Sequence, residues 1–477
     1  MAKSVSIHWF RADLRLSDNP ALTAAADAGD VLPIYILDDE SAGQDAMGAA
    51  SRAWLHHSLS ALDKSLGGNL CVLRGDAGDV LKRLVTETGA SSVHWNRCYE
   101  PWRIIRDSVI KTTMQDMGVE VASHNGSLLW EPWNVKKDDG TPYKVFTPFY
   151  RRGCLNAPPP RQPIAAPSHL KCVSYEGSLG VQALSLLPDN QWADQMTRHW
   201  TIGEQGAQER FADFVENGLS GYKEGRNFPS KPNVSRLSSH LHWGEISPHQ
   251  IWFAVRDVMD AGGPTQDADN FLSEIGWREF SYSLLYHNPE LRRKNLQSKF
   301  DAFAWRQSDN DLVRWQQGQT GYPIVDAAMR ELWQTGYMHN RLRMVVGSFL
   351  VKNLLIHWHH GEAWFWNCLV DADHASNSAS WQWIAGCGAD AAPYFRVFNP
   401  VTQGQKFDGD GNFTRHYVPE LKDMPAKYLF NPWEAPADVL AAAGVRLGET
   451  YPTPVVDVKL SRLAALDAFA LLKQANV

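Results

Sequence analysis

The 477-residue sequence predicts an N-terminal parallel α/β domain of Rossmann-like type followed by an all-helical domain. Short apolar, β-branched runs alternate with helix-like stretches in the first quarter of the chain, and such runs disappear beyond about residue 201. Residues 157–167 read Ala-Pro-Pro-Pro-Arg-Gln-Pro-Ile-Ala-Ala-Pro, a proline density that neither a helix nor a central strand tolerates. We therefore expect an α/β domain over 1–130, a linker over 131–200 and a helical domain over 201–477.

The elements follow from local patterns along the chain. Strands are expected at 5–10, 31–37, 70–73, 92–95 and 119–122, with helices at 51–66, 79–88 and 103–117. In the second half, Ser247-Pro248 is an N-cap followed by a first-turn proline, which predicts a helix through Met259. An amphipathic pattern covers 458–472. The loop after the first strand, 9–20, contains no G-x-G-x-x-G, so a dinucleotide site of the fingerprint type is not expected there.

Charge and composition limit the classes of function. There are 46 basic and 53 acidic residues, a net charge of −7, so any contact with DNA needs a local basic patch, such as Arg292 to Lys294 with Lys299. The 20 tryptophans are about twice the number that average composition supplies. They indicate either aromatic ligand contacts or an unusually aromatic core.

The sequence also favours a cytoplasmic location. Mean hydropathy is −0.35, and no apolar run approaches the roughly 20 residues of a membrane span. The first ten residues contain no long apolar segment of a secretory signal. Six scattered cysteines form no CxxC pair.

The segment 271–280 carries the first candidate site. On a helix, Glu274, Trp277 and Arg278 are spaced i, i+3, i+4 and share a face. A carboxylate, an indole and a guanidinium together suit a base or a flavin. A surface Glu–Arg pair beside a core tryptophan is the alternative.

Four further segments carry weaker signals. Trp381 and Trp383 are two residues apart and cannot serve one surface, so one is expected to face inward and the other a cleft. Residues 339–344 and 234–238 offer cations, amides and hydroxyls that suit phosphates, although solvated faces have the same composition. Residues 357–362 are rich in histidine but lack the spacing of known metal sites, and we expect no metal.

The longer motifs together resemble the cryptochrome/photolyase family, in particular class I cyclobutane pyrimidine dimer (CPD) photolyases. The resemblance runs nearly end to end and rests on Trp9-Phe10-Arg11-x-Asp13-Leu14-Arg15-Leu16-x-Asp18-Asn19, Lys144-Val145-Phe146-Thr147-Pro148-Phe149, Ser235-Arg236-Leu237-Ser238, Trp277-Arg278-Glu279-Phe280, 320–330 and 390–396. It implies an N-terminal antenna domain and a C-terminal helical FAD-binding domain. The implied activity is that of a deoxyribodipyrimidine photo-lyase, a carbon–carbon lyase that repairs DNA by electron transfer from photoexcited reduced FAD to a dimer flipped out of the duplex.

The resemblance also assigns residues. It implies that the catalytic residues are Glu274, Trp277, Met344, Asn377 and Trp383. It implies FAD contacts at Tyr222, Val234, Ser235, Arg236, Leu237, Ser238, Arg278, Arg343, Asp371, Ala372, Asp373 and Asn377. An electron-transfer chain would comprise Trp305, Trp358 and Trp381. Contacts to UV-damaged DNA would come from Arg226, Glu274, Trp277, Asn340, Arg341, Trp383 and Gln403.

Two positions depart from the family pattern. Val234 stands where the family usually has threonine, which removes one hydroxyl from the expected FAD site. Trp102-Arg103 stand where folate-antenna members have an Asn-Glu pair. The second chromophore is therefore left open between a deazaflavin, a second flavin, a folate and none, with Arg52 and Glu100 compatible with a deazaflavin pocket.

Three other functions are alternatives to CPD repair. A cryptochrome-like sensor would bind FAD without repair, but the long C-terminal extension typical of sensors is missing. A six-four photolyase would carry a histidine where this chain has residues 340–344. An ordinary flavin oxidoreductase has no need of Arg226 or Arg341. We expect a monomer that has no membrane partner.

Overall fold

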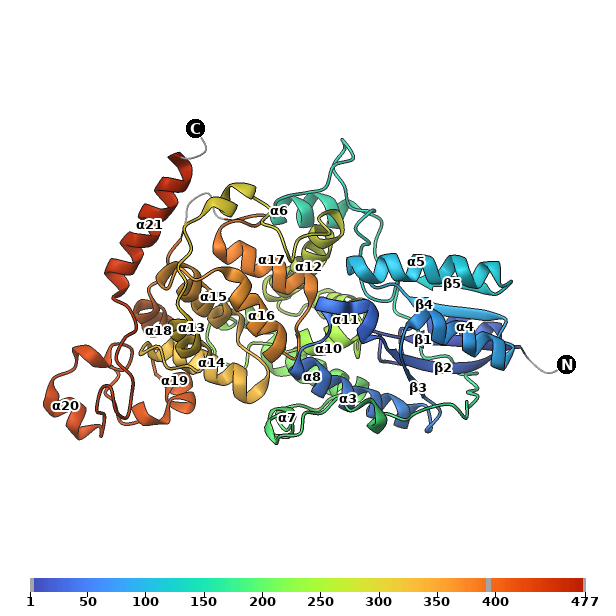
Figure 1. The fold of residues 1–477 in the computed structure, drawn as a ribbon, viewed down its shortest axis with the longest axis horizontal. Coiled ribbons are helices and arrows are strands. Elements are labelled where there is room, and N and C mark those ends of the chain that lie inside the picture. Colours follow the sequence, from blue (N-terminus) through green and yellow to red (C-terminus); the bar gives the residue numbers. More distant parts are fainter. Residues whose placement is uncertain (1–3, 392–395, 475–477) are drawn as a thin grey trace. The chain divides into compact units, whose positions relative to one another are not determined.

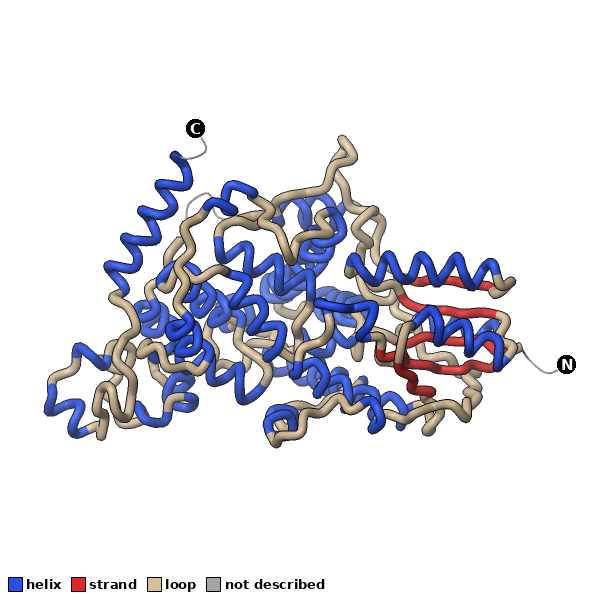
Figure 2. The backbone as a smooth tube through the Cα atoms, viewed as in Figure 1, coloured by secondary structure: helices blue, strands red, loops and turns tan. Residues whose placement is uncertain are grey.

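The first quarter of the chain folds into a five-stranded, all-parallel sheet in the order β3-β2-β1-β4-β5 (Figures 1 and 2). The computed structural model describes residues 4–391 and 396–474. The strands are β1 Val5–Phe10, β2 Asp30–Leu37, β3 Cys71–Arg74, β4 Ser92–Asn96 and β5 Glu120–His124. All five expected strands are confirmed to within two residues. They were recognisable because parallel strands buried on both faces read as nearly continuous apolar runs.

Helices connect the strands and cover the sheet. They are α1 Pro20–Ala28, α2 Asp39–Ala42, α3 Ala49–Ser65, α4 Ala77–Thr88 and α5 Pro101–Asp116. Asn19 caps α1 by accepting from the backbone N–H of Leu22, and Pro20 occupies the first helical position. A buried cluster that includes Ile7, Ile34 and Val93 joins the sheet to α4 and α5.

The sheet reverses its strand order between β1 and β4, the place where open α/β sheets usually bind ligands. Here the chain's own side chains fill this place. Arg11 donates to the carbonyl of Asn96 and pairs with Asp107. The Asn96 amide donates to Asp13 at 2.6 Å. The polar residues of the first motif therefore build an internal network.

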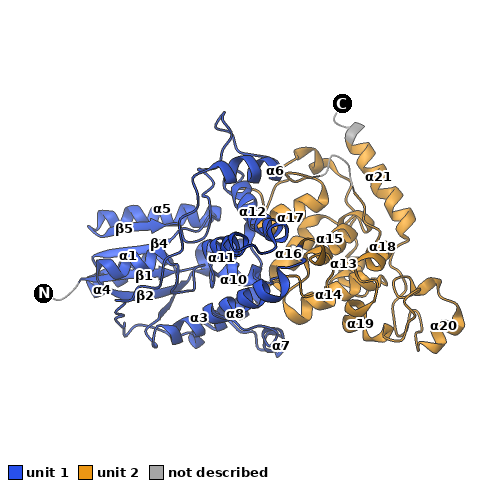
Figure 3. Cartoon of the chain, turned by 180° about the vertical axis from the view of Figure 1, so that it is seen from behind, with its two compact units in different colours: residues 1–222, 235–289, 370–375 blue, residues 223–234, 290–369, 376–477 orange. Residues whose placement is uncertain are grey.

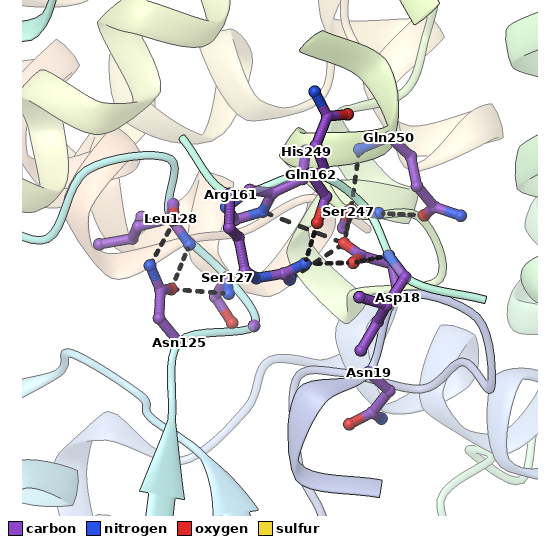
Figure 4. A network of polar contacts seen from close by, with 12 residues as sticks. Asp18, Asn19, Asn125, Ser127, Leu128, Arg161, Gln162, Ser247, His249 and Gln250 are labelled. Carbon is purple, nitrogen blue, oxygen red and sulfur yellow. Dashed lines mark hydrogen bonds and ion pairs between the residues drawn. The ribbon is translucent and has the colours of Figure 1, made fainter. Parts of the chain in front are cut away.

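Asp18 fastens the proline-rich segment to the rest of the N-terminal unit (Figure 4). Its carboxylate pairs with Arg161 and accepts from the backbone N–H of Ile164 at 3.0 Å and from the hydroxyl of Ser247. Asp18 is fully buried, with a positive φ of 50°. Burial lowers the pKa of His249 to about 3, against the opposing attraction of Asp18. The segment expected to be a plain linker is therefore held by a buried ion pair.

After β5 the regular elements of the described chain are helices. The helices are α6 Phe146–Pro148, α7 Trp192–Thr197, α8 Glu204–Asp213, α9 Tyr222–Gly225, α10 Ser238–Trp243, α11 Pro248–Asp260, α12 Thr265–His287, α13 Asp309–Gln316, α14 Pro323–Thr335, α15 Asn340–Ser348, α16 Trp358–Cys368, α17 His374–Ala385, α18 Pro400–Phe407, α19 Asn412–Tyr417, α20 Ala437–Ala442 and α21 Val458–Gln474. Residues 149–153, 214–218 and 349–353 form π-helical turns. Ser247 caps α11 and Pro248 occupies its first position, as expected from the sequence, and Gln250 completes a capping box with Ser247.

The chain divides into two compact units (Figure 3). The first comprises residues 1–222, 235–289 and 370–375, and the second comprises 223–234, 290–369 and 376–477. The first unit therefore contains the sheet and also α10 to α12. The domain boundaries expected from the sequence remain a prediction.

In the described ranges 4–391 and 396–474, no helix is long and apolar enough to cross a membrane. Within the same ranges, no three histidine, cysteine or acidic residues gather closely enough to hold a metal ion. Residues 392–395 of the motif 390–396 lie outside the described residues.

Candidate functional site

Helix α12 presents Glu274, Trp277 and Arg278 on one half-exposed face, as their spacing predicts. The flanking pairs Phe271 and Leu272, Ile275 and Gly276, and Glu279 and Phe280 are buried. The Trp277 ring lies parallel to the Phe146 ring, with centroids 3.8 Å apart and an interplanar angle of 11°. The face therefore combines an acid and a firmly seated indole.

Arg278 is held by two groups of the first unit. Its guanidinium donates to the carbonyl of Ser127 at 2.7 Å and to Glu279 at 3.2 Å. Glu279 also accepts from the backbone N–H of Trp130 at 3.1 Å. Asn125 shapes this loop, because its side-chain oxygen accepts from the backbone N–H groups of Ser127 and Leu128. Residues 125–130 thus fix one cation of the expected FAD site.

Glu279 is a carboxyl group with 1 % of its surface exposed. Burial raises its pKa to about 7, against the opposing attraction of Arg278. A group with this pKa changes its charge near neutral pH. The sequence did not single it out as a site residue.

Other expected FAD contacts of the first unit are buried or half-buried. Asp373 accepts from the hydroxyl of Tyr282 at 2.6 Å. Tyr222 packs edge-on against Phe214 and Phe271. Among the remaining expected contacts, Leu237, Asp371 and Ala372 are buried, Ser235 and Arg236 are half-buried, and Ser238 is exposed at the start of α10.

The backbone at Arg236 has a φ of 53°, in the left-handed region that a non-glycine residue seldom occupies. Its guanidinium carbon lies 4.6 Å from the Trp200 ring centre. Such strain persists only where surrounding contacts enforce it, and it is common at ligand sites. The loop 234–238 is therefore held in a specific conformation.

In the second unit, Asn377 is oriented by Glu362. The Asn377 side-chain amide donates to the Glu362 carbonyl at 3.1 Å and to its carboxylate at 3.2 Å. Glu362 pairs in turn with Arg292 at 3.2 Å. Because the amide nitrogen is used in these bonds, the amide oxygen is the atom that Asn377 can offer to a ligand N–H.

The expected DNA contacts of the second unit include a basic cluster at the start of α15. Arg341 donates to the Asn227 side chain and lies 4.4 Å from the Phe407 ring centre. Burial and the nearby charge of Arg226 lower the pKa of Arg341. Asn340 is exposed, and Met344 and Gln403 are half-exposed. Arg343 donates to the carbonyl of Met338 at 2.8 Å.

Trp381 and Trp383 diverge on α17, as predicted. Trp381 is buried, and a Cβ placed on Gly361 would lie 2.1 Å from its ring, so glycine is required on α16. The half-exposed Trp383 donates its indole N–H to the carbonyl of Asp390 at 3.0 Å. One ring therefore belongs to the core and the other remains accessible.

Trp358 and Trp305 meet around one histidine. The His357 ring lies 5.6 Å from Trp358 and 5.0 Å from Trp305, measured between centroids. Trp358 is fully buried and donates to Asn295 at 2.9 Å. Trp381 contacts Phe365 and Trp315, at 5.0 and 6.2 Å. No sequence pattern singled out Trp315.

The residues weighed for a second chromophore are engaged with neighbours. Arg52 pairs with Asp39 at 2.7 Å, and Glu100 lies 3.7 Å from Arg103. A separate pocket of about 420 Å³ lies along α4 and α5. It is lined by Ser41, Asp76, Gly78, Lys82, Trp102, Ile105, Arg106, Val109, Ile110, Thr113 and Met114.

Comparisons with known proteins agree with this arrangement. Residues 6–168 match the DNA photolyase family model, and residues 271–471 match the FAD binding domain of DNA photolyase. A deoxyribodipyrimidine photo-lyase of Agrobacterium fabrum is 49% identical, covering 98% of both chains. The chain belongs to the photolyase/cryptochrome family. The expected family and fold class are thereby confirmed.

Two further members of the family show how similar the chain is to a photolyase and to a cryptochrome. A crystal structure described as a bacterial class III photolyase from Agrobacterium tumefaciens superposes with a TM-score of 0.95 at 48% identity, covering 99% of this chain and 98% of that one. Cryptochrome-2 of Arabidopsis thaliana is 36% identical over 99% of this chain and 80% of its own. The comparisons thus confirm the family that the resemblance to class I members indicated. One of the similar structures is described as a class III photolyase.

The residues present fit FAD. Arg278 and the hydroxyls of Ser235 and Ser238 supply the cation and donors that a diphosphate requires. Asp373 and Asn377 supply acceptors for N–H and hydroxyl groups. The strained backbone at Arg236 agrees with a loop shaped around a ligand. FAD is the cofactor of this family domain.

Proposed function

We propose that this protein repairs UV-damaged DNA as a deoxyribodipyrimidine photo-lyase that acts on cyclobutane pyrimidine dimers. The observation that carries the proposal is the Glu274, Trp277 and Arg278 face of α12, inside the segment that matches the FAD binding domain of DNA photolyase. Photo-lyases from Agrobacterium fabrum and Escherichia coli, 49% and 36% identical over nearly the whole chain, support it.

Each residue has a physical task in this proposal. Trp277 and Trp383 provide half-exposed indoles against which an extruded dimer packs, and a dimer leaves the duplex at lower cost than an intact pair. Glu274 offers a carboxyl group to hydrogen-bond a pyrimidine, and Met344 offers a half-exposed thioether. Arg226, Asn340, Arg341 and Gln403 contact the DNA backbone, which sets position more than sequence.

The remaining assigned residues hold the cofactor. Bound FAD in its reduced form supplies the electron on absorbing blue light. Arg278 and residues 234–238 bind its phosphates, and Val234 contributes only its backbone N–H there. Tyr222, Arg343, Asp371, Ala372 and Asp373 enclose the rest, and Asn377 presents its amide oxygen. Trp381, Trp358 and Trp305 carry an electron inward when the flavin must be reduced again.

Repair of a defined lesion tests the proposal. The FAD-loaded, chemically reduced protein is mixed with an oligonucleotide that carries one CPD, in blue light and in darkness. Light-dependent loss of the dimer is expected, and Trp277→Ala should weaken lesion binding. Trp333→Ala, at a tryptophan that is 47% exposed, is the matched control. Light-independent repair, or none from a protein that retains FAD, would contradict the proposal.

A blue-light sensor is the second candidate, because Arabidopsis cryptochromes are 36% identical over nearly the whole chain. The two functions differ in the fate of the dimer. A sensor would bind FAD and undergo photoreduction through the tryptophans without splitting the CPD. The same assay therefore separates them.

The pocket along α4 and α5 is the candidate place for a second chromophore. Trp102 gives a flat surface, and the guanidinium of Arg106 lies 4.9 Å from its ring centre. With Lys82 at the rim, the pocket suits an aromatic anion, a description that covers deazaflavins, flavins and folates. Chromophores released by denaturing wild type and Trp102→Ala should differ by one compound. Identical release from the two proteins would contradict binding of a second chromophore in this pocket.

We also propose a cytoplasmic monomer. All six cysteines are free thiols, which suits a reducing compartment. Light scattering of the FAD-loaded protein at several concentrations tests the monomer. A mass near twice 53.5 kDa would contradict it.

A further inference from the structure

Trp277 is one end of a stack of three aromatic rings within the first unit. Phe146 lies parallel to Trp277 at 3.8 Å, and Tyr150 lies parallel to Phe146 at 5.7 Å with an interplanar angle of 8°. Trp277 is half-exposed, whereas Phe146 and Tyr150 are only 9% and 2% exposed. The two inner rings therefore form a buried support beneath one accessible ring.

The innermost ring of the stack, Tyr150, also contacts α12, the helix that carries Trp277. A Cβ on Gly276 would lie 2.5 Å from Cδ2 of Tyr150, closer than real contacts allow. Glycine inside a helix is unfavourable relative to alanine, so its presence here indicates a need for space. Gly276 precedes Trp277 directly. It leaves room for the Tyr150 ring, which supports Trp277 through Phe146.

The segment that carries the inner rings is fastened to the same helix. Tyr150 and Arg151 belong to the π-helical turn Phe149–Gly153, which follows α6 directly. Arg151 makes two hydrogen bonds to Asp269 of α12, at 3.0 and 2.6 Å. Figure 1 shows α6 beside the end of α12. The residues expected to form a passive linker are thus an integral part of the site.

An indole covered on one face by a parallel ring loses that contact if its side chain turns. We propose that Phe146, Tyr150 and Gly276 are positioning residues that hold Trp277 in the orientation in which it packs against an extruded pyrimidine dimer. They thereby set the discrimination between damaged and intact DNA. This inference rests on the proposed function, and it adds residues that act through Trp277.

The test measures binding, with FAD-loaded protein in darkness. The ratio of the Kd for intact duplex to the Kd for a duplex with one CPD is compared for wild type, Phe146→Leu, Phe146→Tyr and Gly276→Ala. Leucine fills much of the volume but offers no flat face, and we expect the ratio to fall roughly threefold to tenfold. Tyrosine keeps the ring and should restore the ratio.

Two comparisons separate positioning from general packing. Phe413→Leu removes a ring that is 5% exposed and lies 4.9 Å from Tyr417, a packing loss similar to that of Phe146→Leu, and it should leave the ratio unchanged. Gly276→Ala favours the helix but collides with Tyr150, so it should lower the ratio without lowering helix stability.

A double-mutant cycle closes the test. In the Trp277→Ala background, Phe146→Leu should have no further effect on the ratio, because Phe146 acts through that ring. Independent, multiplying effects would overturn the inference, as would a wild-type ratio in Phe146→Leu. A wild type with no preference for CPD duplex would overturn the proposed function, and this inference with it. If Trp277→Ala lowers the ratio as expected but Phe146→Leu leaves it unchanged, this inference is overturned and the proposed function stands.

Discussion

Glu279 makes the stability of the protein depend on pH in a way that one substitution removes. Its carboxyl group is buried beside Arg278, and burial raises its pKa from the usual 4.5 to about 7. In the unfolded chain the proton leaves near pH 4.5, whereas the folded protein keeps it until about pH 7. The folded state therefore binds more protons between these values, and stability falls as the pH rises through this window.

The magnitude follows from the two pKa values. A tenfold difference in ionisation constant corresponds to about 1.4 kcal/mol, so the full cost above pH 7 is about 3 kcal/mol. Between pH 5.5 and 8.5, roughly 2 kcal/mol of it is lost. Glu279→Gln cannot ionise and has nearly the shape of the protonated acid. We expect the variant to gain about 2 kcal/mol on wild type over that range.

Thermal unfolding with saturating FAD, from pH 5.5 to 8.5, measures this difference. For a chain of this size, about 2 kcal/mol corresponds to a few degrees in Tm. Glu449→Gln, at a surface acid 64% exposed, is the matched control and should run parallel to wild type. A constant Tm difference between Glu279→Gln and wild type at all pH values would refute the reasoning.

Three further predictions concern other contacts. Trp381→Phe should abolish photoreduction of the flavin but leave repair by chemically reduced protein intact, and equal loss of both activities would contradict these separate roles. Glu362→Ala removes the carboxylate, one of the two Glu362 acceptors that orient Asn377, so the reduction potential of bound FAD should shift, and spectroelectrochemistry measures it. Asp326→Ala should lower the free energy of unfolding by about 3 kcal/mol, because the buried carboxylate accepts from Thr320, Gly321 and the Tyr451 hydroxyl. Denaturant unfolding of the FAD-loaded protein tests it, with lesion preference as the property that should not change.

The fold was predictable wherever a local pattern carries the structure. The runs at β1 and β2 are buried on both faces, so their apolar composition is visible in the sequence alone. Ser247 and Pro248 predict the start of α11, because serine caps a helix and proline suits its first position. The residues that the sequence could not place depend on partners far along the chain.

The candidate site divides in the same way. The spacing of Glu274, Trp277 and Arg278 on α12 was sufficient to place them on one face. Glu279 adjoins them in sequence, but its raised pKa comes from burial in the folded protein, and its hydrogen-bond partner Trp130 lies 149 positions earlier. Phe146 likewise belongs to the family motif at 144–149, yet only the folded chain shows that its ring stacks on Trp277. The helical period predicts which residues share a face of a helix, but it does not predict which other parts of the chain pack against that face.

The basic cluster of the second unit also bears on how an acidic protein binds DNA. Burial and, after it, the nearby charge of Arg226 lower the pKa of Arg341, so the charge on the Arg341 guanidinium is disfavoured at this position. Bringing two like charges together in a partly buried place is unfavourable unless an anion compensates for them. A DNA phosphate beside Arg341 is such an anion, and it would stabilise the charge of this guanidinium. With a net charge of −7, long-range attraction is weak, so affinity should depend on these few contacts and fall steeply with salt.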